Sequence, residues 1–376
     1  MILVVIVVNI LFLTSPIYYD HSALERDLTT EAVDSESTSL KILTFNAWHG
    51  LVTDEGILKL GEYETSDRRE VRYSQLLEEL QRLDPDVIAL QEANPLPEYA
   101  TKIASDLGFD EIHQIANGGV KLFGWGIPLN VSEGLILLAR EELNLELVGK
   151  IRLSGPWFSI QNTQVSFQLS ETRYALIGKI RVEGKEIYIL NTHLHAGFPF
   201  GDTYIDDLSE LRNAGEITDS EYDFFDNRAK EASQRREEEL FLAISWIRNE
   251  TDNEHPIILL GDFNSIENSN EIRTILDYHF IDAFREKNPG LSGFTSDSIL
   301  NPKVRLMEEN SLESQGQTDR FESKYLEIAS RIDYIFLSSH FQSKNILESF
   351  VTLNRSNEDG VYPSDHFAVF AEILLP

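Results

Sequence analysis

Short apolar runs alternate with polar stretches along most of the chain. Runs such as Lys41–Phe45 and Val87–Gln91 have the length and composition of β-strands. The same criteria predict further strands at Leu135–Ala139, Tyr174–Val182, Glu186–Asn191, Pro256–Leu260, Ile332–Leu337 and Phe367–Leu374.

Two longer segments have apolar residues at the spacing of an amphipathic helix. In the first, Arg68–Leu83, the residues predicted to face inward are Val71, Leu76, Leu77, Leu80 and Leu83. In the second, Arg228–Asn249, they are Leu240, Phe241, Ile244 and Ile247. Strands interleaved with helices predict an α/β sandwich rather than a bundle or a barrel.

The amino-terminal segment differs from the rest of the chain. It begins MILVVIVVNILFLTSP, an apolar run too short for a membrane span but suited to a signal peptide, although a basic start and a clear cleavage site are missing. A buried strand or helix is the alternative. Because a polar stretch follows, we predict a signal peptide or membrane anchor at 1–19, a linker at 20–39 and one domain at 40–376. This predicts a secreted or membrane-anchored, extracytoplasmic protein.

Composition narrows the possible functions. The chain has 63 acidic and 32 basic residues, a formal net charge of -31. Such a chain repels polyanions at long range, which disfavours nucleic acid as a partner. The absence of cysteine excludes disulfides, thiolate metal sites and thiol nucleophiles.

Polar residues recur where the predicted strands end. They are Asn46, Glu92, Asn191, His193, Asp262, Asn264, Asp333 and the segment Ser364-Asp365-His366. In an α/β sheet such positions meet at one edge, where ligands usually bind. Any one of them alone is more simply a turn residue or a structural histidine. Their repetition argues against that reading, and Asp333, inside an apolar strand, needs a partner if it is buried.

These residue types support one kind of chemistry. Carboxylate and amide oxygens suit Mg²⁺, Mn²⁺ or Ca²⁺, whereas Zn²⁺ favours more histidine or cysteine. An Asp–His pair can act as a general base toward water. A metal that neutralises phosphate oxygens beside such a pair would hydrolyse a phosphate ester.

Six segments in order, LTFNAW, IALQE, NTHLHA, GDFNS, RIDYIF and SDHFAV, resemble the signature of the endonuclease/exonuclease/phosphatase superfamily. They lie within Lys41–Pro376. The resemblance implies a DNase I-like fold, a four-layered α/β sandwich of two packed mixed β-sheets flanked by helices.

The resemblance also assigns roles to individual residues. Glu92 corresponds to the principal metal ligand with Asn46 beside it, and Asp365 to a further carboxylate of the metal site. Asp262 and Asn264 correspond to the pair that contacts the phosphate and the nucleophile or a second metal. Mg²⁺ is the expected cofactor, with Mn²⁺ or Ca²⁺ as alternatives.

The same resemblance covers the histidines. His366 corresponds to the catalytic base and Asp333 to its orienting partner. His193 corresponds to the residue that stabilises the phosphoryl transition state or protonates the leaving group. Which histidine is the acid and which is the base stays open, and the resemblance does not cover His195.

Within the superfamily the chain looks most like the neutral sphingomyelinases. The similarity rests on THLHA, Ser132-Glu133-Gly134-Leu135, Gly293-Phe294-Thr295 and Asn301-Pro302. It implies hydrolysis of sphingomyelin to ceramide and phosphocholine at a membrane surface, with no protein partner implied. Candidate loops for the choline group or the bilayer are Phe123-Gly124-Trp125-Gly126, Pro156-Trp157-Phe158 and Phe198-Pro199-Phe200, the last followed by Asp202, Tyr204, Asp206 and Asp207. Ordinary loop-anchoring aromatics are the alternative.

Other functions of the same superfamily are a secreted nuclease and a phosphoinositide phosphatase. Both need clustered cations, and the chain offers small groups such as Arg68-Arg69 and Arg235-Arg236, which are expected on solvated helix faces. A non-catalytic relative would usually lose a metal ligand or the Asp–His pair, and every signature segment is intact.

Overall fold

A computed structural model of the chain describes residues 38–52, 62–118, 120–122, 125–127, 132–155, 160–161, 165–167, 172–197, 202–301 and 329–376. These residues belong to one compact unit, Thr38–Pro376. The segment predicted as a leader, 1–19, and nearly all of the predicted linker, 20–39, lie outside the described residues. None of the described helices is both long enough and apolar enough to span a bilayer.

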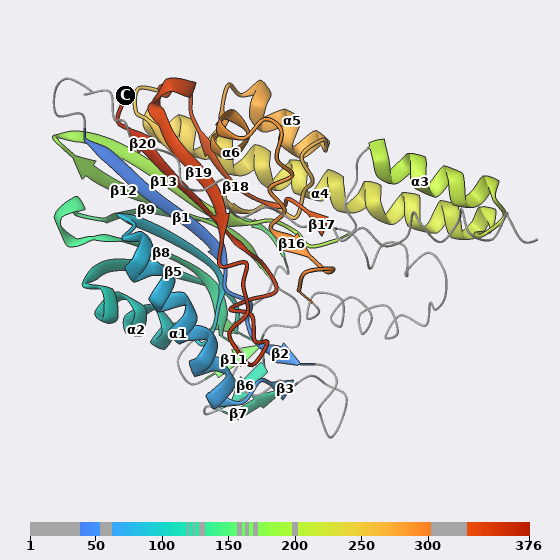
Figure 1. Cartoon of the computed structure of the whole chain (residues 1–376), viewed down its shortest axis with the longest axis horizontal. Helices are drawn as coiled ribbons and strands as arrows, with labels where there is room; N and C mark the ends of the chain where they lie inside the picture. The colour runs from blue at the N-terminus through green and yellow to red at the C-terminus, as the bar shows by residue number, and fades with distance from the viewer. Residues whose placement is uncertain are drawn as a thin grey trace, which may run out of the picture. The chain divides into compact units, whose positions relative to one another are not determined.

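Two six-stranded mixed sheets form the centre of the unit (Figure 1). The first has the order β19(Ile346–Thr352), β20(Ala368–Leu374), β1(Ser39–Asn46), β4(Val87–Ala93), β8(Glu133–Arg140), β5(Phe109–Asn117). The second has the order β15(Ile281–Asp282), β18(Asp333–Leu337), β14(Ile257–Asp262), β13(Lys185–His193), β12(Arg173–Val182), β9(Glu146–Ser154). Each sheet contains one parallel pair, β1–β4 or β13–β14, with antiparallel neighbours on both sides.

The remaining elements surround these sheets. The helices are α1(Ser66–Leu83), α2(Glu98–Leu107), α3(Asp202–Asn213), α4(Asp219–Thr251), α5(Asn270–Asp277) and α6(Ala283–Lys287), with 3₁₀ turns η2(Glu141–Leu143) and η3(Ser343–Asn345). The small sheets consist of β2(Leu51–Val52) with β3(Glu62–Tyr63), β16(Ser296–Asp297) with β17(Ala329–Ser330), and β10(Ile160–Gln161), β11(Val165–Phe167), β6(Val120–Leu122) and β7(Trp125–Ile127).

Alternation along the strands gives both large sheets two apolar faces. Ile42 of β1 and Ile189 of β13 pack in the core between the sheets. Their neighbours Leu43 and Leu190 point the other way, into clusters shared with helices. Helices α1 and α2 cover the first sheet, and α4 and α5 cover the second (Figure 1). The predicted sandwich of two mixed sheets flanked by helices is therefore confirmed.

The strand predictions are confirmed with small shifts at their ends, but three longer strands were not predicted. These are β5, β9 and β19, and each is an edge strand that mixes charged and apolar residues. Edge strands bury less of their surface, so their apolar pattern is weaker. Helices α2, α3, α5 and α6 were also not predicted.

Both predicted helices exist, but in each of them one residue that was predicted to face inward is exposed. In α1, Val71 is 38% exposed, whereas Tyr73 and Arg72 are buried. In α4, which extends over Asp219–Thr251, Phe241 is 57% exposed. Successive residues lie about 100° apart around a helix, so Phe241 falls beside the stripe that packs on the sheet.

The prediction of solvated cations on α4 was wrong for Arg236. Its guanidinium is fully buried and Nε donates to Glu271 Oε1 at 2.8 Å. Arg235 is the more exposed of the two, and its Nη2 donates to Ser154 Oγ at 3.2 Å. Arg236 was misassigned because α4 is covered by α5 at this point, which the sequence of α4 does not indicate.

A buried amide cluster joins the two sheets next to the strand ends. Gln91 of β4 donates to Asn191 Oδ1 of β13 at 2.8 Å and to Thr44 Oγ1 of β1 at 3.1 Å. The Asn191 amide group in turn donates to the carbonyl oxygens of Leu90 (3.0 Å) and Ile136 (2.8 Å) of the opposite sheet. Asn191 is fully buried, so its hydrogen bonds fix the register of one sheet against the other.

We predict that Asn191→Ala lowers the free energy of unfolding by at least about 2 kcal/mol, because each buried polar group left without a partner costs about 1–3 kcal/mol. Urea unfolding followed by circular dichroism measures this. Asn288→Ala is the matched control: its amide also donates to two carbonyl oxygens, at 3.1 and 2.7 Å, but it is only partly buried. Equal losses for the two variants would contradict a special role for the inter-sheet cluster.

Candidate active site

The polar strand ends continue the faces that form the core between the sheets. In β13, Ile187 and Ile189 belong to this core, and His193 follows at the same two-residue spacing. By the same spacing, Asn46 of β1, Asp262 of β14 and Asp333 of β18 lie on the inward faces of their strands. Because these strand ends lie at one edge of the sandwich, the fold brings the four side chains together.

Glu92 reaches the site through a backbone irregularity. Regular alternation after the inward-facing Gln91 would turn Glu92 toward the helices. Instead, β4 changes register against β8 between Leu90 and Ala93, and Glu92 has a φ of 53°. A bulge of this kind redirects a side chain, and here it turns the carboxylate of Glu92 toward Asn46 and His49.

His366 and Asp333 form a close pair. Nδ1 of His366 donates to Asp333 Oδ2 at 2.9 Å. Thr295 supports the pair: its Oγ1 accepts from the backbone N–H of Asp333 at 3.1 Å, and its carbonyl oxygen accepts from Phe367 at 2.7 Å. Burial opposes a charge on the imidazole, but Asp333 and Asp262 outweigh it and hold the pKa of His366 well above its usual range.

Asp262 lies at the centre of the site. Its Oδ2 accepts from Asn46 Nδ2 at 3.0 Å and lies 3.4 Å from His193 Nε2 and 3.9 Å from His366 Nε2. Burial and the neighbouring Asp333 carboxylate raise the pKa of Asp262 to about 7. Burial and the cation of Arg173 hold the pKa of His193 well below its usual range. The two histidines that flank Asp262 therefore differ in their tendency to carry a proton.

The other predicted site residues take less central places. Asn264 has a φ of 48°; its backbone N–H donates to Asp262 Oδ1 at 2.8 Å and its amide to the Leu194 carbonyl at 3.0 Å. Asp365 accepts from Ser364 Oγ at 3.0 Å. His195, which the family resemblance did not cover, donates its backbone N–H to Glu239 Oε2 of α4 at 2.8 Å. Asn264 thus orients Asp262, whereas the side chain of Asp365 is held by the hydroxyl of the preceding residue.

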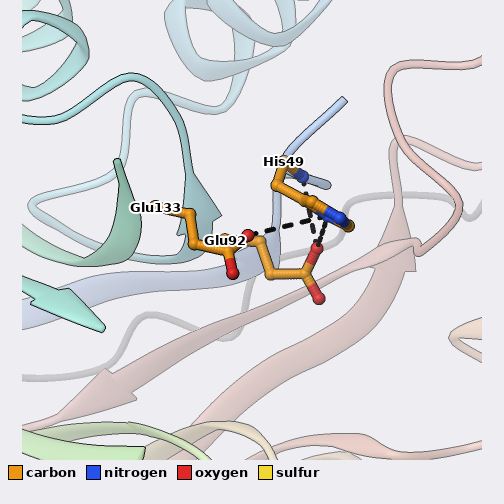
Figure 2. A group of neighbouring side chains, drawn as sticks. All are labelled: His49, Glu92 and Glu133. Atoms are coloured by element: carbon orange, nitrogen blue, oxygen red, sulfur yellow. Dashed lines mark hydrogen bonds and ion pairs between the residues drawn. The ribbon is translucent and has the colours of Figure 1, made fainter. Parts of the chain in front are cut away.

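Sequence reasoning missed a second ionisable cluster, formed by His49, Glu92 and Glu133 (Figure 2). Nδ1 of His49 lies 2.5 Å from Glu92 Oε2 and 3.8 Å from Glu133 Oε2. Burial opposes the charge on the imidazole, but Glu133 and Glu92 outweigh it and raise the pKa of His49 to about 10. Two features of the sequence could have indicated this cluster. His49 directly follows LTFNAW, and Glu133 lies in Ser132-Glu133-Gly134-Leu135, a segment that resembles the neutral sphingomyelinases.

Arg72 of α1 fixes the loops that carry the site residues, and it was also missed. Its guanidinium donates to the carbonyl oxygens of Ala47 (2.8 Å), Trp48 (3.2 Å) and Pro363 (2.7 Å). Glu64 balances its charge through a bond of 3.0 Å from Nε. One buried cation therefore connects the loop after β1 with the loop that precedes His366.

The donor set fits a divalent cation at two neighbouring positions. Ligand atoms of His49, Glu92 and Glu133 lie within 4.8 Å of one another, as do those of a second group, Asp262, Asp333 and His366. The buried Asp333 Oδ1 accepts no hydrogen bond from the described residues. Asn46 and His193 lie between the two groups. Carboxylates this close to each other need a cation or a proton to offset their repulsion.

The chain matches a known protein family over most of its length. Residues 43–366 match the Endonuclease/Exonuclease/phosphatase family. A comparison with curated proteins found no significant match. The roles carried over from the family signature stay predictions, although the structure brings into contact Asn46, Glu92, His193, Asp262, Asp333 and His366.

Several solved structures are similar to the chain. An endonuclease/exonuclease/phosphatase family protein from Bacteroides thetaiotaomicron has 18% identity and a TM-score of 0.55, covering 91% of this chain and 96% of that chain. A mannosyl-6-phosphatase from the same organism has 17% identity and a TM-score of 0.53, covering 89% and 100%. Truncated Caenorhabditis elegans TDP2 has 14% identity and a TM-score of 0.52, covering 89% and 97%.

At these identities the similar structures support the fold alone, and the particular likeness to neutral sphingomyelinases stays a prediction. The family match covers most of the chain, from the strand that ends in Asn46 to His366. The chain belongs to the endonuclease/exonuclease/phosphatase family.

Proposed function

We propose that the protein is a divalent-metal-dependent phosphodiesterase that hydrolyses a phospholipid head group, with sphingomyelin as the first candidate substrate. The reaction type is inferred from the His366–Asp333 pair, in which Nδ1 of His366 lies 2.9 Å from Asp333 Oδ2, beside the carboxylate of Asp262. A histidine held by a carboxylate can transfer a proton to or from a reacting oxygen. A bound divalent ion would supply positive charge to the phosphate oxygens.

The chain's own residues divide the remaining work. Water loses a proton to an imidazole, its oxygen bonds to phosphorus, and the ester bond to the lipid alcohol breaks as the alcohol oxygen gains a proton. Asp333 holds the proton on Nδ1 of His366, which leaves Nε2 facing Asp262 and the space beside it. His193 is the second histidine at Asp262, and the assignment of acid and base between the two stays open.

The charge of the chain supports a substrate with one phosphodiester rather than a polyanion. With a net charge of -31, each additional phosphate would need a local cation. Arg236 belongs to one of the few pairs of adjacent basic residues in the sequence, and it is buried in an ion pair with Glu271. A zwitterionic choline phosphodiester makes a smaller demand, and the THLHA segment also favours it.

The residues proposed to hold the choline group are only partly described. Tyr204 is 3% exposed and packs with Leu208 and Phe225 between α3 and α4, so it is excluded as a wall of an open pocket. The side chains of Trp125, Trp157 and Phe198-Pro199-Phe200 lie outside the described residues. Their contact with a membrane surface, and export of the protein beyond the cytoplasm, stay part of the proposal.

We predict release of phosphocholine from sphingomyelin in mixed micelles with Mg²⁺, and little or no nicking of plasmid DNA. The panel should include phosphatidylcholine, a phosphoinositide and a sugar phosphate. Efficient nicking of DNA, or release of inorganic phosphate from a monoester, without release of phosphocholine would show that the proposed substrate is wrong and that another activity of the family applies.

We predict that His366→Ala lowers kcat by about 10²–10⁴-fold, the usual contribution of a general acid or base. Asp333→Asn should also lower kcat strongly, because the amide can stabilise the wrong tautomer of His366. His340→Ala is the matched control, since His340 follows the opposite end of β18 and contacts Ser338 Oγ at 3.3 Å. Near-normal turnover by His366→Ala would mean that another group takes the proton.

We predict that EDTA abolishes hydrolysis and that Mg²⁺ or Mn²⁺ restores it. Glu92→Gln should weaken metal binding about tenfold or more, since even the loss of a ligand's hydrogen-bond partner typically costs about 10–100-fold. Isothermal titration calorimetry measures the binding, and circular dichroism checks that the variant is folded. Full activity in EDTA would contradict the metal dependence.

A further inference from the structure

We propose that His49 and Glu133 are ligands of the metal held by Glu92, and that the imidazole nitrogen makes this position prefer Mn²⁺ over Mg²⁺. The inference rests on the proposed metal dependence. It adds two residues for which the family signature in this chain predicts no role, and it assigns the metal preference that the sequence left open.

The geometry of the three side chains supports a shared ion. Their ligand atoms lie within 4.8 Å of one another, and His49 Nδ1 is 2.5 Å from Glu92 Oε2. Two ligands of one ion are separated by at most twice the metal–ligand distance, about 4–5 Å for bonds of 2.0–2.6 Å. Figure 2 shows the imidazole of His49 and the carboxylate of Glu133 turned toward Glu92. The three groups can therefore reach one cation with small adjustments.

Separate parts of the fold hold each of these side chains in place. Glu133 begins β8, is 6% exposed, and its Oε1 accepts from Asn117 Nδ2 at 3.2 Å. The backbone N–H of His49 donates to Glu92 Oε2 at 3.2 Å, and its carbonyl oxygen accepts from Asn94 Nδ2 at 2.8 Å. Such fixed positions limit relaxation of the two carboxylates away from each other.

Asn46 turns a hydrogen-bond donor toward Glu92. Its amide nitrogen, a donor, faces Glu92 Oε1 at 3.2 Å, while its Oδ1 accepts from the backbone N–H of Trp48 at 3.0 Å. In this orientation Asn46 orients Glu92 through its amide nitrogen. His49 supplies the additional ligand, and that ligand is nitrogen.

A nitrogen ligand changes the order of metal preference. Mg²⁺ prefers oxygen ligands and gives up its waters reluctantly, whereas Mn²⁺ accepts both carboxylate and imidazole and binds mixed sites more tightly. Two carboxylates with one imidazole therefore favour Mn²⁺, the ion used as the probe below.

The test measures Mn²⁺ binding to the full chain by electron paramagnetic resonance, without substrate. We expect Mn²⁺ to bind at least about tenfold more tightly than Mg²⁺ in competition, a difference of about 1.4 kcal/mol. Pulsed spectra of bound Mn²⁺ should show coupling to an imidazole nitrogen. His49→Gln should remove this coupling and bring the two affinities close together, and Glu133→Gln should weaken binding of both ions.

His113→Gln is the matched control, because His113 Nδ1 lies 2.9 Å from Glu111 Oε2 in a similar pair on β5 that is absent from both candidate metal groups. It should leave Mn²⁺ binding unchanged. Nitrogen coupling that persists in folded His49→Gln, or equal affinities for Mn²⁺ and Mg²⁺ in the unaltered chain, would overturn the inference even if phosphoester hydrolysis is metal-dependent. Nitrogen-coupled Mn²⁺ that His49→Gln releases would support the inference even if no phosphoester were hydrolysed.

Discussion

The hydrogen bonds of Asn191 and Gln91 connect the two sheets at the point where their apolar core ends. On one side of this cluster lies the core of isoleucine, leucine and valine side chains, and on the other lie the ionisable groups of the site. The first sheet contributes Asn46 and Glu92, and the second contributes His193, Asp262 and Asp333. Contacts of about 3 Å between residues of different sheets require that the sheets keep one register, and a nonpolar interface alone would specify that register weakly.

The site gathers more ionisable groups than a protein interior usually accepts. Two carboxylates approach His49, and two approach His366. Buried carboxylates are stable only when cations or protons offset their charge. The imidazoles of His49 and His366 contribute to this balance, and so does a proton on Asp262, whose pKa is raised to about 7. The same arrangement makes the site ready to accept a divalent cation, which is the chemistry expected of the endonuclease/exonuclease/phosphatase family.

Two buried cations support this arrangement from outside the site. Arg72 connects the loop after β1 to the loop before His366, and Arg236 joins α4 to α5. Both are on helices and pair with carboxylates outside the site, Arg72 with Glu64 and Arg236 with Glu271. A chain with so few basic residues places these at structural positions, which leaves fewer of them for holding a polyanionic substrate.

Much of the fold was evident from the sequence because buried strands have a local signature. The runs that end in Asn46, Glu92, His193 and Asp262 are apolar on both faces, so their position and polar ends could be read directly, and the ordered segments indicated the family. The site residues carried over from those segments do converge. The weaker patterns of β5, β9 and β19 were missed because strands near a sheet edge bury less surface.

Tertiary structure alone decided the remaining features. The sequence does not determine that β4 changes register between Leu90 and Ala93, that His49 and Glu133 meet Glu92 from other segments, or that Arg236 is buried by α5. Each depends on contacts between residues far apart in the chain. Periodicity indicates which side of a strand or helix is apolar, but the partner that covers a polar side chain is set by how the sheets and helices pack.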